Sequence, residues 1–118
     1  MSMIIHISKD VDTSVNSLVD NYTLLANELD INRVVKTFSI IKHTEGSNEY
    51  QIKQQLLSYC STVIVSNLID IHGTETFRSI SQSSKYNTLK SEIRATIMNN
   101  RKEEIEGICS QIYMLQRL

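Results

Sequence analysis

The fold is decided by residues 49–72, which read EYQIKQQLLSYCSTVIVSNLIDIH. Their apolar positions recur at steps of three and four residues, the spacing of an amphipathic helix. One apolar line holds Ile52, Leu56, Tyr59 and Val63, and the line beside it holds Leu57, Cys60, Ile64, Leu68 and Ile71. Because the two lines cover about half of the helix circumference, this helix should have neighbours on two sides. Gly73 is expected to end it, since glycine is common just beyond a helix end.

The residues before this stretch predict another long helix, from about residue 9 to residue 40. Its apolar residues recur at steps of 4, 3, 4, 3 and 4, in the order Val11, Val15, Leu18, Tyr22, Leu25 and Leu29. This spacing places them on one seam, as in a helix that packs lengthwise against another helix. The next seam position is Asn32. Residues 31–41 therefore continue the helix with a rotated face or form a short second piece, and their β-branched run also tolerates an extended conformation.

A third helix is expected from about residue 84 to residue 116. It follows a serine-rich polar connection at residues 74–86, and a polar loop at residues 43–48 precedes the central helix. Its apolar positions fall into two groups, Leu89, Ile93 and Ile97, then Ile105, Ile108, Ile112 and Leu115. The polar run at residues 99–104 separates these groups, so the helix should come to the surface or break there. Gly107 weakens it further, by about 1 kcal/mol relative to alanine.

The composition indicates one intracellular domain. The chain has 118 residues, no proline, three glycines and a formal charge of −1. Direct nucleic-acid binding needs a surplus of Lys and Arg, and a basic membrane anchor needs the same surplus. The first residues lack the basic lead of a signal peptide, and no stretch has the roughly 20 apolar residues of a membrane span. Cys60 and Cys109 are too few for a secreted disulfide scaffold and are expected to be reduced packing residues.

Catalytic and metal-site patterns fit poorly. His6, His43 and His72 have no second ligand three or four residues away, as a helix-borne metal site requires. Cys60 has no nearby base to lower its pKa. The carboxylates of Glu103, Glu104 and Glu106 stand beside Arg101 and Lys102, which is typical of a solvated helix face, with a docking site for a basic partner as the alternative. The sequence thus predicts no enzyme activity, no cofactor and no small-molecule substrate.

Long helices from a short chain point to an assembly subunit. Three such rods cover each other only partly, and large exposed apolar stripes usually mark a partner interface. We expect an all-α fold, a long helical hairpin plus a C-terminal helix, that completes a four-helix-type bundle with a partner chain. A compact monomeric three-helix bundle is the alternative. The predicted partner interface comprises Val11, Val15, Leu18, Tyr22, Leu25, Leu29, Ile52, Leu56, Tyr59, Val63, Ile105, Ile108, Ile112 and Leu115.

Several short motifs resemble one family. The run at residues 15–23, VNSLVDNYT, resembles the first-helix signature of subunit 22 of the Mediator complex. The glycine-containing loop followed by Asn48-Glu49-Tyr50 is similar to the way that family opens its second helix. Val65-Ser66-Asn67-Leu68 falls late in the second helix, where the family has a like stretch, and Thr88-Leu89 and the run at residues 101–105 resemble parts of its C-terminal helix. The connection between the second and third helices is shorter here than in the family.

The resemblance implies a nuclear, non-catalytic subunit of the Mediator head module. Such a subunit pairs with subunit 11 through a helical bundle, contacts the scaffold subunit 17, and acts as a coactivator of RNA polymerase II transcription. The first-helix seam and the first apolar line of residues 49–72 would then form the heterodimer. Two other interpretations fit the same pattern, a different coiled-coil adaptor, such as a tethering or kinetochore subunit, and an autonomous monomeric helical regulator of viral or phage type.

Overall fold

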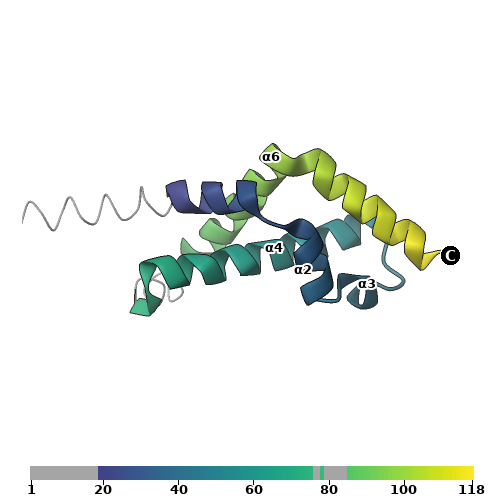
Figure 1. Cartoon of the computed structure of the whole chain (residues 1–118), viewed down its shortest axis with the longest axis horizontal. Coiled ribbons are helices and arrows are strands. Elements are labelled where there is room, and N and C mark those ends of the chain that lie inside the picture. The colour runs from purple at the N-terminus through teal and green to yellow at the C-terminus, as the bar shows by residue number, and fades with distance from the viewer. Residues whose placement is uncertain (1–18, 76–77, 79–84) are drawn as a thin grey trace, which may run out of the picture.

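The computed structural model describes residues 19–75, 78 and 85–118, and their regular elements are all α-helices. The all-α prediction is confirmed. In chain order the elements are a helix over residues 19–28, α2 (Ile31–Thr37), α3 (Ile40–His43), α4 (Glu49–His72) and α6 (Lys85–Gln116) (Figure 1).

The central helix α4 has the bounds that its apolar spacing predicts. At its start, Asn48 and Gln51 form a capping box: the Gln51 N–H donates to the Asn48 side chain at 2.8 Å, and the Asn48 N–H donates to the Gln51 side chain at 3.0 Å. These bonds satisfy amides that the first helical turn leaves free. At its end, Gly73 has a φ of 93° and donates to the Ile69 carbonyl at 2.8 Å. A positive φ favours glycine, so the predicted helix stop has a backbone cause.

Of the two alternatives for residues 31–41, the structure shows the short separate piece and not a continuation of one helix from residue 9 to residue 40. The chain leaves the helix at Leu29 and Asp30 and enters α2, where the Asp30 carboxylate accepts from the Arg33 N–H at 3.1 Å. Ser39, in the left-handed conformation with a φ of 51°, then separates α2 from α3. With these two changes of direction, α2 places Ile31 and Val34 in the core and α3 places Ile40 there. The predicted helical residues 9–18 lie outside the described part.

Helix α6 bends near its middle, where the sequence predicts that it surfaces or breaks (Figure 1). Arg101 has a non-helical backbone, with φ −137° and ψ 32°, so two helical halves meet at this residue. Ile97 before the break and Ile105 after it are both fully buried. Both halves of α6 therefore contribute buried apolar side chains to the core on either side of the break.

The other helices pack around α4. The helix over residues 19–28 lies between α4 and the first half of α6, where Asn21 contacts His72 and the Tyr22 hydroxyl donates to Glu92 at 3.4 Å. Near the other end of α4, α2 and α3 take its place. Both the helix over residues 19–28 and α6 run antiparallel to α4, so α4 has neighbours on two sides, as predicted (Figure 1).

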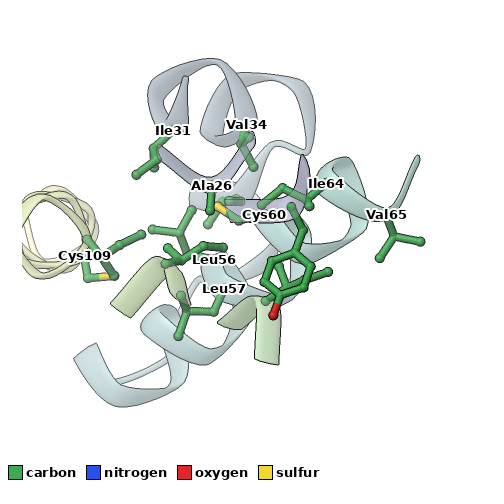
Figure 2. Packing of buried hydrophobic residues seen from close by; sticks show 14 of the residues in the cluster. Ala26, Ile31, Val34, Leu56, Leu57, Cys60, Ile64, Val65 and Cys109 are labelled. Atoms are coloured by element: carbon green, nitrogen blue, oxygen red, sulfur yellow. The ribbon is translucent and has the colours of Figure 1, made fainter. Parts of the chain in front are cut away.

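The core of the described residues draws side chains from all of its helices. Figure 2 shows α4 residues such as Leu56 and Ile64 packed against Ala26, Ile31 and Val34. The fully buried large side chains come from the α2 and α3 segments and from both long helices, and comprise Ile31, Ile40, Ile52, Leu56, Ile64, Leu68, Ile93, Ile97 and Ile105. Burial of apolar surface of this kind is the main favourable contribution to folding.

Candidate protein-interaction surface

The structure divides the predicted interface residues into four groups. Val11, Val15 and Leu18 lie outside the described residues. The buried group comprises Tyr22, Ile52, Leu56, Ile105 and Ile112. The half-buried group comprises Leu25, Leu29, Tyr59, Val63 and Ile108. Leu115 is 56% exposed. In this conformation the buried group contacts the chain's own core, so the half-buried and exposed residues are the ones that a partner could reach.

Three of the half-buried residues line one open groove of about 530 Å³. Leu25 and Leu29 come from the end of the first described helix, and Val63 comes from α4. Helix α2 supplies the third wall with Val34 and the adjoining Phe38. We call this the seam groove, and its remaining lining residues are the polar Glu28, Asp30, Arg33, Thr37 and Asn67. The apolar floor and polar rim resemble the anatomy of protein interfaces.

Helix α2 is the wall that the sequence analysis missed. Its residues Val34 and Phe38 stand four positions apart, which is a helical signal, but the same signal fits a continuation of the preceding helix. Phe38 is held in place by stacking on Tyr59, with ring centroids 4.5 Å apart and an interplanar angle of 16°. Stacked aromatic pairs stabilise a fold beyond their buried area, so this edge of the groove is well anchored.

Arg101 fixes the end of the helix that carries Leu25 and Leu29. Its guanidinium donates to the Ala26 carbonyl at 3.2 Å and also to the Leu29 carbonyl. The same group donates to both carboxylate oxygens of Glu104, at 2.9 and 2.8 Å. A cation at a helix C-terminus satisfies free carbonyls and opposes the negative end of the helix dipole. Arg101, which lies at the break in α6, therefore caps the C-terminal end of the helix over residues 19–28.

This role corrects part of the charged-run prediction. The sequence places Arg101 in a solvated face, but its side chain is only 15% exposed, while that of Glu104 is 43% exposed. Asn100 joins the contact, because its side-chain amide donates to the Asn27 side chain at 2.8 Å. Nothing in the local sequence separates Arg101 from its exposed neighbour Lys102, so only the tertiary contacts identify it.

The two thiols are free and buried. Cys60 lies among Ala26, Leu56 and Ile64, while Cys109 lies on α6 toward one side of the cluster (Figure 2). Burial raises the pKa of Cys60 to about 12 and the pKa of Cys109 to about 11, from an ordinary value of 9.0. Because the thiolate is the reactive form, both groups should be inert in the folded chain.

Two measurements check this inertness. At neutral pH the folded chain is expected to react slowly with DTNB, and both thiols should react at once in denaturant. The free energy of unfolding should also fall as the pH rises above 9.0 toward about 11 and 12, because the unfolded chain releases these protons first. The stabilising contribution is therefore complete below the ordinary pKa, and each thiol adds a slope of up to about 1.4 kcal/mol per pH unit.

The matched control is the double variant Cys60→Ala, Cys109→Ala. Its unfolding free energy should depend less steeply on pH in this range than that of the parent chain. The pKa of Tyr22 is also raised, first by burial and then by Glu92, but this group is present in both proteins and cancels in the comparison. Equal slopes, or rapid labelling of the folded chain, would contradict the assignment.

His43 and His72 lie apart in the described structure. His43 ends α3 with its ring 6.3 Å from that of Tyr59, and His72 is the last residue of α4, so the two lie at different ends of the core. His6 is outside the described residues. Over residues 19–75, 78 and 85–118, no three His, Cys, Asp or Glu side chains converge as a metal site would need. Among those same residues, no helix has the length and apolar content to cross a membrane.

Comparisons with known proteins add no relative. No family model, no curated protein and no solved structure matches the chain.

Proposed function

We propose that this chain is a non-catalytic helical subunit of a multiprotein assembly and that the seam groove receives a helix of its partner. The observation that carries the proposal is the meeting of Leu25, Leu29 and Val63 in one open groove. The spacing of apolar residues assigned all three to a partner interface, although Val63 is 34 residues from Leu29 in the sequence. A partner helix with apolar anchors at helical spacing would bury the apolar floor that the chain leaves half exposed.

At a finer level, we propose the Mediator head module as the assembly, with subunit 11 as the partner in the groove and subunit 17 as a further contact. The support is the resemblance of residues 15–23 to the first-helix signature of subunit 22, because the same seam leads into Leu25 and Leu29. The chain would then act in the nucleus as a coactivator component. Another coiled-coil adaptor would use the same groove with a different partner.

An autonomous monomeric regulator is the second candidate. It is favoured by a specific observation, since Tyr22, Ile52, Leu56, Ile105 and Ile112 are buried in the chain's own core. A domain whose broad apolar faces cover each other can be stable without a partner. The two candidates differ in whether the half-buried floor of the seam groove has an occupant.

The test begins with the purified chain, its mass by light scattering and its melt by circular dichroism. The chain is then co-expressed with the subunit 11 of the same organism, and the complex is isolated by affinity and size-exclusion chromatography. If the proposal holds, the heterodimer forms, and Leu25→Asp or Val63→Asp weakens it at least tenfold, a loss of about 1.4 kcal/mol. The matched control is Leu24→Asp, since Leu24 is 53% exposed on the same helix and does not line the groove.

The outcomes separate the candidates. A monomer that melts cooperatively and does not bind subunit 11 would overturn the Mediator assignment. If such a monomer also keeps its melt and its single species after Leu25→Asp, the autonomous domain is the better account. A complex that Leu24→Asp weakens as much as Val63→Asp would place the interface elsewhere.

A further inference from the structure

A second groove lies between α3 and the C-terminal end of α6 and shares no lining residue with the seam groove. It has a volume of about 590 Å³, and we call it the C-terminal groove. Its apolar wall is formed by Val35, Ile41 and Leu115, and its polar lining includes Lys36 and Lys42. Residues 36–37 of α2 thus face different grooves, with Lys36 at this one and Thr37 at the other.

The apolar wall of this groove is unusually exposed for such large side chains. Ile41 is 45% exposed and Leu115 is 56% exposed, and Met114 beside Leu115 is 65% exposed. A shallow hollow of about 410 Å³ continues from Leu115 along α6 over Met114 and Gln111. A contiguous apolar surface of this kind on a folded chain usually marks a binding site, whereas single exposed apolar residues need no explanation.

The surroundings of the groove are basic, although the chain as a whole is not. The lining of the groove contains two basic residues, Lys36 and Lys42. The whole chain has 12 Lys and Arg against 13 Asp and Glu. Glu45 is the one carboxylate in the groove lining. The lining of the C-terminal groove thus carries two positively charged side chains against one negatively charged side chain.

The two walls are tied together, so the groove does not need its ligand in order to form. The Gln116 side-chain amide donates to the Ile41 carbonyl at 2.8 Å and to the Thr44 hydroxyl at 2.8 Å. The Thr44 hydroxyl in turn donates to the Ile40 carbonyl at 2.7 Å and is buried. A groove that is already ordered lowers the entropy that binding must overcome.

We propose that the C-terminal groove binds an amphipathic helix whose polar face is acidic. Apolar anchors at helical spacing would cover Ile41 and Leu115, and carboxylates on the neighbouring face would lie over Lys36 and Lys42. Complementary charge selects the partner and speeds its association. A nucleic acid suits the site less well, because its affinity comes from many phosphate contacts and the groove wall is aliphatic.

Three synthetic peptides of about four helical turns test this proposal against the full chain, with binding followed by fluorescence anisotropy. They share one apolar face of Leu and Phe and carry Glu, Gln or Lys on the polar face. We expect the Glu peptide to bind at least about tenfold more tightly than the Gln peptide and the Lys peptide to bind most weakly. Added salt should reduce the difference between the Glu and Gln peptides, because it screens exposed charges.

Substitutions locate the binding site. The double variant Lys36→Glu, Lys42→Glu should reverse the preference, so that the Lys peptide binds best. Leu115→Asp should weaken all three peptides by about tenfold or more. The matched controls are Lys102→Glu, an exposed charge on α6 outside the groove lining, and Ile71→Asp, at a 55% exposed residue near the end of α4. Both controls should bind the Glu peptide like the parent chain, and a circular-dichroism melt checks that each variant is folded.

Three results would overturn the proposal. The first is equal binding of the Glu and Gln peptides. The second is binding of a single-stranded oligothymidine that Lys36→Glu, Lys42→Glu abolishes, combined with no binding of the Glu peptide, which would indicate a nucleic-acid site. The third is a dimeric mass of the chain that Leu115→Asp returns to monomer, which would assign the apolar wall to a second copy. The seam groove shares no lining residue with this site, so failure here leaves the proposed function intact.

Discussion

Leu56→Ala is expected to lower the free energy of unfolding of the isolated chain by about 2–5 kcal/mol. Leu56 is fully buried on α4 and belongs to the one core cluster to which all the described helices contribute. The substitution removes apolar contacts and leaves a cavity that the tightly packed neighbours fill only in part. A domain of this size has a total stability of about 5–15 kcal/mol, so this loss is large. Urea unfolding followed by circular dichroism measures it.

The loss of unfolding free energy in Leu56→Ala should be compared with the losses in Leu25→Ala and Leu24→Ala. Leu25 is half-buried in the seam groove, and Leu24 is exposed. Their effects on the isolated chain should be smaller, and Leu24→Ala should stay within about 0.5 kcal/mol. In the heterodimer the difference between the destabilising effects of Leu25→Ala and Leu24→Ala should become larger. A small effect of Leu56→Ala on the isolated chain would show that this position is packed only when a partner is present.

Arg101→Met is expected to lower the free energy of unfolding by about 2–3 kcal/mol. The side chain keeps its length and apolar contacts but loses its hydrogen bonds to Ala26, Leu29 and Glu104. The two carbonyls at the helix end then have no replacement donor within the described contacts, and a polar group left unpaired in a partly buried place costs free energy. Besides urea unfolding, amide hydrogen exchange should show faster opening of residues 22–29 than of α4.

Two further variants separate geometry from charge. Arg101→Lys keeps the positive charge at the helix end but cannot form the forked contact with Glu104, so its stability should fall between those of the parent and Arg101→Met. Lys102→Ala is the matched control, since Lys102 is exposed and adjacent in sequence. An unchanged exchange rate for residues 22–29 in Arg101→Met would remove Arg101 from the capping role.

The sequence predicted the fold best where the apolar period is long and uninterrupted. The 24 residues of α4 keep their spacing from start to end, and the capping residue Asn48 and the stop at Gly73 are local signals. The end of the first helix near Leu29 was harder to predict. The apolar seam stops there, but Val34 and Phe38 still follow a helical spacing. What decides between the two alternatives is burial of Ile31 and Ile40, and burial depends on residues far away in the chain.

The candidate site could be predicted only in part. Spacing identifies a helix face that packs, but it does not say whether the other surface belongs to the same chain or to another one. Ile52 and Leu25 were therefore assigned together, although one lies in the core and the other in an open groove. Arg101 could not be recognised from its neighbourhood, because the carbonyls that it contacts lie 75 and 72 residues earlier.

The long sequence separation between Arg101 and the carbonyls that it contacts affects how the chain folds during synthesis. The ribosome adds Arg101 72 residues after Leu29, which takes roughly 4–14 s at about 5–20 residues per second. During this interval residues 19–28 have neither their Arg101 cap nor α6, whose Glu92 accepts the hydrogen bond of Tyr22. The apolar faces of the nascent segment are then open to chaperones or to an assembly partner that is already present.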